Sequence, residues 1–590
     1  MIVSKLVDLA IARWLAGPSA NAIVPVARQV FGAAERSECV LLLLDRVRPD
    51  IVNLISEVTA AQSVVVCAVN IDKDEFTRSA LVLNAGIVTI RDQIDLHRLL
   101  AVRGKPAVIV DALTMRDSEL CLMMMRLFIS AIQDGGYYVV LDAAASGDSG
   151  RTIAPLVSYA TSTVVDGRGS EEDLDDDDYL FGEQIDFVTV SSGGMVLSKV
   201  GNGFAKLRHG EVDSVLQRRY GADWGRRLEV MRGRRIEFDV VRTTNRRDLC
   251  SKRFPQENRI PECSVREYRN VCVVPRQIVI KDDLLLPDTF RWGEARRLRN
   301  TALRDLNHYY ATLPESIDEA PLVSGEYFHL DLEYNKHFGH FMTEAIPRLY
   351  GWDAAREAFP DVRILTNSHS DGGRPATYQR DLLEAYGISQ DRIHVIDGPV
   401  KVERLVCARP LFENMRFADP RLAQTYSRIR QGLLESVGVS PGKPVRKIFV
   451  SRRRGMWREC TNSDELERFF SSRGFDIVRP EGHSIAEQAR MFSEARVVAG
   501  YIGSALYNIM FAARGIDVVG FVNESYVATN EFLISSVMGH RLHMFFGNEF
   551  GEEGRSKDVD GRPVGGTNSD YFFDLKRNGP QLEDLLDRIG

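Results

Sequence analysis

Short apolar runs separated by longer segments of mixed polarity dominate the first two hundred residues of the chain. Runs rich in β-branched residues predict strands at 39–45, 63–69, 86–90, 107–111 and 137–142. Continuous apolar runs joined by helical stretches are typical of a parallel sheet covered on both faces. Two further runs, 187–190 and 195–199, are split by Ser-Ser-Gly-Gly and predict a hairpin at the end of this sheet.

The alternation of strands and helices returns twice after residue 265. A β-rich start (271–274, 277–280, 284–286) precedes strands predicted at 361–365, 394–396 and 404–408, and a second set is predicted at 448–450, 475–478, 496–498 and 517–519. Helical stretches separate the strands of each set, which favours two Rossmann-like halves. We therefore predict a multi-domain α/β fold with domains at 1–200, 265–435 and 436–590, and an Arg-rich linker at 201–264.

The composition is that of an ordinary globular protein. Of the 590 residues 44% are hydrophobic and 27% are charged, and the formal net charge of -7 argues against a nucleic-acid binder. No apolar run is long enough to span a membrane. The 8 cysteines are scattered without a Cys-x-x-Cys pair, which favours reduced thiols and a cytoplasmic compartment.

The N-terminal stretch 1–17 is amphipathic. It carries Lys5, Asp8 and Arg13 and lacks the uninterrupted apolar core of a signal peptide. We expect it to dock against the protein's own core. The alternative is peripheral contact with a membrane surface.

A glycine turn near the C-terminus is the most informative feature of the chain. An apolar strand over 497–500 runs into Tyr501-Ile-Gly-Ser504 and then into a short helix. A helix that begins there points its free N–H groups beyond the strand end, where phosphate is the usual ligand. Gly503 and Ser504 are therefore the candidate phosphate ligands.

Other motifs precede this turn in a fixed order. They are Gly339-His-Phe-Met-Thr-Glu344, Ser451-Arg452, Arg458-x-x-x-Asn462 and Glu487-Gln488. Together with Gly503-Ser-Ala-Leu506 and Asn508, they resemble glycosyltransferase family 61 over about residues 265–550. The resemblance implies a GT-B fold, with an acceptor-side half at 265–435 and a nucleotide-sugar-binding half at 436–590. It also implies transfer of a sugar from a nucleotide-sugar donor to an acceptor.

Two positions depart from the family pattern. The pattern has His-Gly where this chain has Ile502-Gly503, and it often has a glutamate where this chain has Gly520. Both lie where contacts with the donor phosphates or ribose are expected. They leave open a second interpretation, a catalytically impaired pseudo-glycosyltransferase that acts as a binding or assembly subunit of a polysaccharide-synthesis complex.

The N-terminal strands resemble a class I methyltransferase domain, in which 107–112 and 134–142 would be the fourth and fifth strands. Such enzymes need a glycine-rich turn after the first strand, so that the backbone can approach S-adenosylmethionine. Here the turn at 44–50 contains no glycine. We predict a degenerate domain that does not bind S-adenosylmethionine and that serves as a scaffold or binds a partner. A bifunctional methyl- and glycosyltransferase is the rival hypothesis.

His340 and Glu344 are the candidate catalytic residues. On a helix that begins at Gly339 they lie one turn apart on the same face. His340 is the first candidate for the base that takes the acceptor proton, and Glu344 for its partner or for the base itself. Alternatively, His340 only caps the helix and Glu344 pairs with Arg348. His337, His340 and Glu344 also have a spacing that a metal could use, but we predict no metal.

Arginines after the strand at 447–450 are the candidates for binding the donor diphosphate. Arg452 and Arg458 would stabilise the charge of the departing nucleoside diphosphate. Asn462 follows the family pattern, but it could equally be a helix N-cap with Glu465 in the capping-box position. Asn508 matches the family position on the helix after the glycine turn.

Two charged segments have simpler interpretations. The acidic run 171–178 is typical of a solvated loop rather than a metal site. The Arg-rich residues between 200 and 260 indicate a helical linker that passes into an irregular segment. A basic groove for an anionic acceptor or a membrane is the alternative.

The sequence thus predicts an inverting glycosyltransferase in the cytoplasm, with peripheral contact to the inner face of the cell membrane left open. Its partners would be a nucleotide sugar and a glycan or lipid-linked acceptor, and it would need no cofactor. By family resemblance alone, it would take part in the biosynthesis of a cell-surface or capsular polysaccharide.

Overall fold

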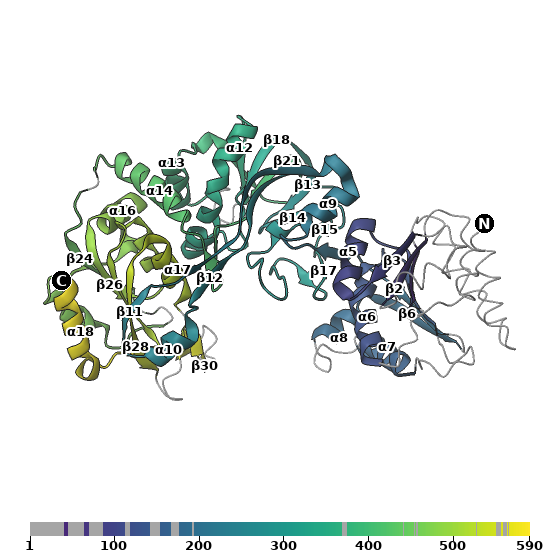
Figure 1. Ribbon diagram of the computed structural model, residues 1–590, viewed down its shortest axis with the longest axis horizontal. Coiled ribbons are helices and arrows are strands. Elements are labelled where there is room, and N and C mark those ends of the chain that lie inside the picture. Colours follow the sequence, from purple (N-terminus) through teal and green to yellow (C-terminus); the bar gives the residue numbers. More distant parts are fainter. Residues whose placement is uncertain are drawn as a thin grey trace. The chain divides into compact units, whose positions relative to one another are not determined.

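The computed structural model forms two compact units, and the predicted multi-domain α/β fold is confirmed (Figure 1). Unit 1 consists of residues 1–224, 279–289 and 295–316, and unit 2 of residues 225–278, 290–294 and 317–590. The structure describes residues 40–44, 64–69, 86–111, 118–141, 154–166, 176–191, 194–367, 374–440, 442–453, 455, 458–526, 528–549, 556–557, 563–564 and 566–590.

The apolar runs of unit 1 form a seven-stranded sheet with the order β3-β2-β1-β4-β5-β7-β6. The first five strands pair in parallel, whereas β7 is antiparallel to both β5 and β6. All seven strands were predicted. Their bounds are β1 (Val40–Leu44), β2 (Val64–Val69), β3 (Gly86–Ile90), β4 (Val108–Asp111), β5 (Tyr137–Leu141), β6 (Ile185–Ser191) and β7 (Gly194–Lys199).

In the part of unit 1 that the structure describes, five α-helices accompany this sheet. They are α5 (Gln93–Arg103), α6 (Ser118–Phe128), α7 (Ala154–Asp166), α8 (Asp176–Gly182) and α9 (Val212–Tyr220). Asp92 caps α5, since its side chain accepts the N–H groups of Ile94 and Asp95. The predictions for the N-terminal stretch 1–17 and for the turn at 45–50 lie outside the described residues.

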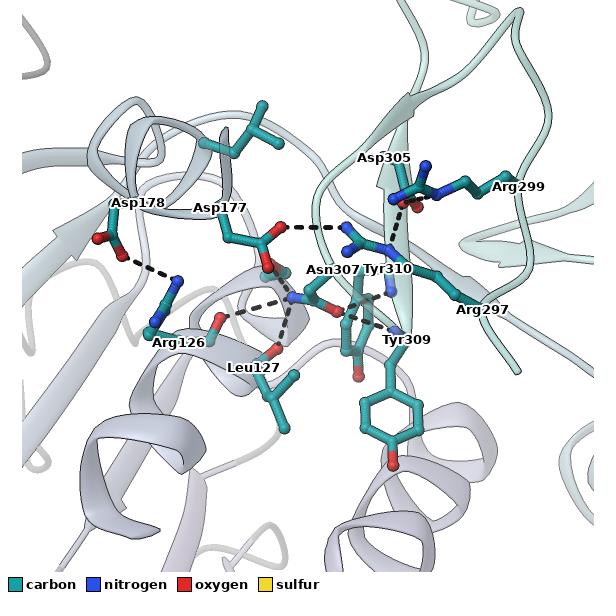
Figure 2. A network of polar contacts seen from close by, with 12 residues as sticks. Arg126, Leu127, Asp177, Asp178, Arg297, Arg299, Asp305, Asn307, Tyr309 and Tyr310 are labelled. Carbon is teal, nitrogen blue, oxygen red and sulfur yellow. Dashed lines mark hydrogen bonds and ion pairs between the residues drawn. The ribbon is translucent and has the colours of Figure 1, made fainter. Parts of the chain in front are cut away.

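A second set of strands in unit 1 follows the order β16-β17-β8-β15-β14. Its strands are β8 (Phe204–Lys206), β14 (Ile278–Lys281), β15 (Leu284–Leu285), β16 (Arg304–Asp305) and β17 (Tyr310–Thr312). Asn307 ties this part of the unit to α6 (Figure 2). Its side chain donates to the carbonyl of Leu127 at 3.1 Å and accepts the N–H groups of Tyr309 and Tyr310 at 2.9 and 3.1 Å.

The end of the acidic run does not form the solvated loop that was expected. From Asp176 onward these residues belong to α8, and two of them make ion pairs (Figure 2). Asp178 pairs with Arg126 at 2.8 Å, and Asp177 pairs with Arg297 at 3.2 Å. The sequence pattern missed this because both arginines are distant in the chain. Residues 171–175 lie outside the described residues.

Unit 2 contains two mainly parallel sheets. The first has the order β13-β21-β18-β19-β20, with β9 on the other side of β13. Strands β21, β18, β19 and β20 are parallel, whereas β13 runs antiparallel to β21 and β9. The bounds are β9 (Gly225–Met231), β13 (Cys263–Val274), β18 (Leu322–His329), β19 (Arg363–Asn367), β20 (Ile393–Ile396) and β21 (Val400–Ala408), with helices α12 (Trp352–Ala358), α13 (Thr377–Tyr386) and α14 (Leu422–Ser436).

The second sheet of unit 2 has the order β11-β28-β27-β26-β24-β25, and all its pairings along this path are parallel. A short strand, β31 (Tyr571–Phe572), adds to β28 in the antiparallel sense. The strands are β11 (Val241–Thr244), β24 (Arg446–Val450), β25 (Asp476–Val478), β26 (Ala495–Tyr501), β27 (Asp517–Asn523) and β28 (Arg541–Glu549), with helices α15 (Ser463–Ser471), α16 (Ile485–Ser493), α17 (Thr529–Met538) and α18 (Leu575–Ile589).

The Arg-rich segment 201–264, expected to be a linker, is largely ordered secondary structure. Besides β8, α9, β9 and β11 it supplies β10 (Arg234–Glu237), α10 (Arg247–Arg253) and β12 (Glu257–Ile260). Several of its arginines make ion pairs, for example Arg226 with Glu267 at 2.8 Å and Arg234 with Asp419 at 2.9 Å. The paired arginines therefore do not support the alternative of an open basic groove.

One hydrophobic core joins the two sheets of unit 2. Its buried side chains come from β18 and the short helix η8 (Ile346–Gly351) of the first half, from α14, and from β24 and the short helix η11 (Ser504–Phe511) of the second. They include Phe328, Leu349, Tyr426, Val450 and Ile509. None of the helices in the described ranges has the length and apolar character that a membrane crossing needs. The thiols of Cys121, Cys250, Cys263, Cys272, Cys407 and Cys460 are free.

Candidate functional site

The segment that carries His340 and Glu344 is helical, but it is not the regular α-helix that was predicted. It begins as α11 (Phe338–His340), continues as one π-turn, η7 (Phe341–Ala345), and tightens into a 3-10 helix, η8 (Ile346–Gly351). Pro347 has no N–H to donate within the segment, which is incompatible with an uninterrupted α-helix. Single π-turns of this kind are frequent at functional sites.

His340 and Glu344 meet as the sequence predicted. The Nδ1 atom of His340 lies 2.7 Å from Oε1 of Glu344. Burial alone would raise the pKa of Glu344, but the hydrogen bond from His340 and the charge of Arg291 outweigh it and lower that pKa. The carboxylate is therefore ionised and can only accept, so Nδ1 of His340 carries the proton. The lone pair of His340 is then on Nε2.

Arg291 is the third member of this group, and no motif in the sequence indicated it. Its Nη2 atom donates to Oε1 of Glu344 at 2.6 Å and lies 3.0 Å from Nδ1 of His340. The guanidinium also lies over the rings of Trp292 and Tyr334, at 4.7 and 5.0 Å. These contacts fix Arg291, which belongs to the short segment 290–294 of unit 2.

Two aromatic rings, those of Tyr334 and His337, lie close to the imidazole of His340. Tyr334 stacks on it with ring centroids 5.0 Å apart, and His337 lies at 4.7 Å in a tilted arrangement. His337, not His340, caps the helix, because its Nδ1 accepts the N–H of His340 at 3.4 Å. Burial, with a smaller contribution from His340, lowers the pKa of His337, which keeps this ring neutral.

Two other interpretations of this segment are not supported. Glu344 makes its ion pair with Arg291, while Arg348 donates to the carbonyl of Asp331 at 3.1 Å. A metal site at His337, His340 and Glu344 was considered and not favoured. In the described part of the chain, no group of three or more His, Cys, Asp or Glu side chains is arranged to hold a metal ion.

The His340 segment touches the glycine turn at Gly339. A Cβ atom at Gly339 would lie 2.6 Å from Oγ of Ser504 and 3.1 Å from the ring of Tyr507. Only glycine fits so close an approach. The first and last motifs of the family pattern are therefore neighbours in space.

The glycine turn differs from the prediction in the group that its amide contacts. The N–H of Gly503, predicted to bind phosphate, donates to Oε1 of Glu531 at 2.7 Å. The helix that follows is a 3-10 helix, η11 (Ser504–Phe511), whose first residue is Ser504. Gly503 has a φ of 150°, which favours glycine. The turn amide is thus used inside the protein, and Ser504 remains a candidate ligand.

Arg452 and Arg458 lie beside this turn. A Cβ atom at Gly503 would be 3.2 Å from Nη2 of Arg452, and the guanidinium of Arg458 lies 4.0 Å over the ring of Tyr526. Burial, followed by the charge of Arg458, lowers the pKa of Arg452. The turn therefore has Glu531 bonded to its amide and two guanidinium groups close by.

A pocket of about 450 Å³ opens next to Arg452 at the carboxyl ends of β24 and β25. Ligands of open α/β sheets bind at this end of the strands. The lining combines guanidinium groups with carboxylates, so it suits a ligand that carries both anionic and hydroxyl groups. The lining residues are Arg452, Arg453, Ser463, Asp464, Glu467, Arg479, Glu481 and Gly482.

Asn462 and Asn508 make contacts within the fold. The Nδ2 atom of Asn462 donates to the carbonyl of Phe573 at 2.8 Å and to Glu465 at 2.9 Å, and its side chain does not cap α15. The fully buried Asn508 donates to Gln488 at 2.9 Å, which joins η11 to α16. The side chains of Asn462 and Asn508 thus bond to neighbouring segments of unit 2 and hold these segments together.

The two departures from the family pattern lie against each other. Ile502 is only 1% exposed, and a Cβ atom at Gly520 would lie 2.5 Å from its Cδ1. The side chain of Ile502 thus occupies the space over Gly520. This packing leaves no room there for a longer side chain at position 520.

Comparison with protein families gives one match. Residues 338–519, a range that begins at α11 and ends within β27, match the model described as Glycosyltransferase 61. The match supports a glycosyltransferase in this part of unit 2. Comparison with curated protein sequences gave no match.

Solved structures with some likeness are methyltransferases, and they match the N-terminal region weakly. The MycE methyltransferase of the mycinamycin biosynthetic pathway, in complex with Mg and SAH, has 13% identity and a TM-score of 0.25, over 34% of this chain and 54% of that one. An O-methyltransferase family protein from Burkholderia thailandensis has 11% identity and a TM-score of 0.19, over 32% and 62%. The chain thus spans about half the length of the first structure.

Proposed function

We propose that unit 2 transfers a sugar from a nucleotide-sugar donor to an acceptor hydroxyl, with inversion at the anomeric carbon. The family match supports sugar transfer, and the orientation of His340 is the observation that carries the mechanism. A histidine whose Nδ1–H is held by a carboxylate presents the lone pair of Nε2, as a general base requires. The side chain of His340 remains 28% exposed, so an acceptor can reach it.

In the proposed reaction, Nε2 of His340 removes the proton of the acceptor hydroxyl while the hydroxyl oxygen attacks the anomeric carbon. The bond between that carbon and the diphosphate oxygen breaks, and its electrons leave with the nucleoside diphosphate. Attack from the face opposite the leaving group inverts the configuration. Glu344 stabilises the imidazolium that forms, and Arg291 keeps Glu344 ionised.

Arg452 and Arg458 would bind the diphosphate and stabilise the charge that develops on it. Such groups are effective because they are fixed before the reaction begins. Since guanidinium groups supply the positive charge, the proposed reaction uses no metal or other cofactor. The two parallel sheets of unit 2 would be the halves of a GT-B fold, and the Gly339–Ser504 contact would join them.

By family resemblance, the proposed setting is cytoplasmic synthesis of a cell-surface polysaccharide. The acceptor would be a glycan or a lipid-linked glycan.

The test is a panel of UDP-, GDP- and CMP-sugars with the purified full-length protein. We expect one donor class to bind and to be hydrolysed slowly without an acceptor. The His340→Ala variant should lose about 10²- to 10⁴-fold in rate while the affinity for the nucleotide changes little. Normal turnover in that variant would exclude His340 as the base.

A second candidate function is a binding subunit without catalysis. It is favoured by one observation, the packing of Ile502 over Gly520, which removes both polar side chains of the family pattern from the donor side. Wild-type protein that binds a nucleotide but does not turn over its sugar would support this alternative.

A further inference from the structure

Glu531 is a fully buried carboxyl group at the edge of the proposed donor site. It lies in the first turn of α17, and its side chain is 0% exposed. Oε1 accepts the N–H of Gly503 at 2.7 Å, while Oε2 makes no hydrogen bond to any residue that the structure describes. A buried carboxylate is costly, and an apolar side chain would fill this position with less loss of solvation. Stability alone therefore does not explain Glu531.

The residue before Glu531 contacts the same 3-10 helix at a second point. Asn530 donates through Nδ2 to the hydroxyl of Tyr507 at 2.6 Å, and its Oδ1 atom is buried without a hydrogen bond among the described residues. Two consecutive residues of α17, Asn530 and Glu531, thus bond to Tyr507 within η11 and to Gly503 just before it. Tyr507 in turn lies next to Gly339, so these contacts also connect α17 with the His340 segment.

The turn has little other polar support from its own strands. Ile502 is apolar and lies over Gly520, which has no side chain. On the other side, Arg452 lies against Gly503, and the positive charges of Arg458 and Arg452 act on Glu531. The carboxyl group of Glu531 thus accepts the turn amide, and the charges of the two proposed diphosphate ligands act on it.

We propose that Glu531 is a positioning residue of the donor site, which acts by accepting the N–H of Gly503. The turn is then fixed with Ser504 and Arg452 as the groups that contact the donor diphosphate, and the amide of Gly503 is not a ligand. This inference rests on the proposed function. It replaces the expected binding of phosphate by a glycine-turn amide with binding by side chains.

The test uses three variants of the full-length protein, Glu531→Gln, Glu531→Asp and Glu531→Leu. Gln keeps an oxygen that can accept the Gly503 N–H, Asp keeps the carboxyl group but withdraws the acceptor by one methylene, and Leu removes the acceptor. Glu267→Gln is the matched control, because Glu267 is also 0% exposed and lies in ion pairs of β13. Dissociation constants for UDP, GDP and CMP are measured by calorimetry.

We expect the Gln variant and the control to bind the nucleotide that the wild type prefers, with a Kd within about 3-fold of the wild-type value. In the Gln variant the amide oxygen still accepts the Gly503 N–H. The Asp and Leu variants should bind at least about 10-fold more weakly, and hydrogen exchange of the peptide 502–508 should be faster in both. Should the Leu variant fail to fold, the Asp variant gives the same answer.

Two results would overturn the inference. Asp and Leu variants that bind as the wild type does would show that the hydrogen bond positions nothing. A Gln variant that loses as much affinity as Leu would show that charge matters and not the bond to Gly503. A wild type that binds none of the three nucleotides would instead refute the proposed function itself, and the donor role of Glu531 with it.

Discussion

Gly339 lies so close to Ser504 that a methyl group cannot be placed between them: a Cβ atom at Gly339 would be 2.6 Å from the Ser504 hydroxyl oxygen. This contact brings the proposed base segment and the proposed donor turn together. There is no free space around this position, because the rings of His337 and Tyr507 would each be 3.1 Å from the same Cβ atom. A side chain at position 339 would therefore force these two segments apart.

Gly339→Ala should separate the two motifs with a modest loss of stability. Overpacking of this kind typically costs about 1–3 kcal/mol, and the easiest relief is a shift of the Ser504 turn. We expect transfer activity to fall more than the thermal midpoint does. The double variant Gly339→Ala, Ser504→Gly tests the cause, because it removes the clashing hydroxyl, and it should recover part of the geometry. An unchanged rate in the single variant would show that the contact is not needed.

Glu344→Gln should lower kcat by about 10²- to 10⁴-fold and leave KM nearly unchanged. The amide oxygen can still orient the imidazole of His340, but it cannot stabilise the imidazolium charge. Steady-state kinetics with the donor found in the panel measure both constants. A large effect on KM alone would indicate that Glu344 binds substrate and does not support a base.

Arg291→Met should make the carboxyl group of Glu344 harder to ionise. The guanidinium charge helps to lower the pKa of Glu344 against its burial, so that pKa should rise in the variant. In the wild type, the lowered pKa of Glu344 stabilises the fold when the pH is above the pKa of this group in the unfolded chain. This stabilisation is lost as the pH falls through the pKa of Glu344 in the folded protein. The acidic limb of the pH–rate profile should therefore move to higher pH in Arg291→Met. Arg297→Met in unit 1 is a control from outside the site.

The stability of unit 2 should decrease with rising pH because of Glu531. Burial raises the pKa of the Glu531 carboxyl group from its ordinary value of 4.5 to about 7. A raised carboxyl pKa contributes stability below the unfolded pKa, and this is lost as the pH rises toward 7. The shift corresponds to about 3 kcal/mol at most. Glu531→Gln should flatten the change of the thermal midpoint between pH 5 and 8, and an equally steep profile in that variant would contradict the assignment.

Gly520→Ala should be destabilising in a way that depends on Ile502. The added methyl group would lie 2.5 Å from Cδ1 of Ile502, so one of the two must move. We expect a loss of about 1–3 kcal/mol that Ile502→Ala largely relieves. A double-mutant cycle by denaturant unfolding measures the coupling. Additive effects would mean that the two side chains do not share this space.

Local patterns predicted most strands and the order of the motifs, because strand periodicity and turn residues are properties of neighbouring positions. The central strands β18 and β28 were missed. The first is interrupted by Ser324-Gly325 and the second carries Arg541 and His543, so neither shows an unbroken apolar run. Such strands are identified by the neighbours with which they pair.

The residues that contact the site residues could also not be predicted from the sequence. The pairing of His340 with Glu344 follows from their spacing, whereas Arg291 lies 49 positions before His340 in a segment without a motif. Glu531 appeared as an ordinary helix residue 28 positions after Gly503. Long-range pairs of this kind depend on the tertiary fold and produce no repeating pattern in the sequence.

The chain passes between the two units at 224/225, 278/279, 289/290, 294/295 and 316/317. Arg291 is carried by the shortest excursion, five residues with unit 1 sequence before and after them. A gene fragment that begins at residue 317 would keep His340, Glu344 and the glycine turn, yet lack Arg291 and the strands β9, β11 and β13. A single cut in the chain therefore cannot separate the two units, because each is assembled from three segments that alternate along the sequence.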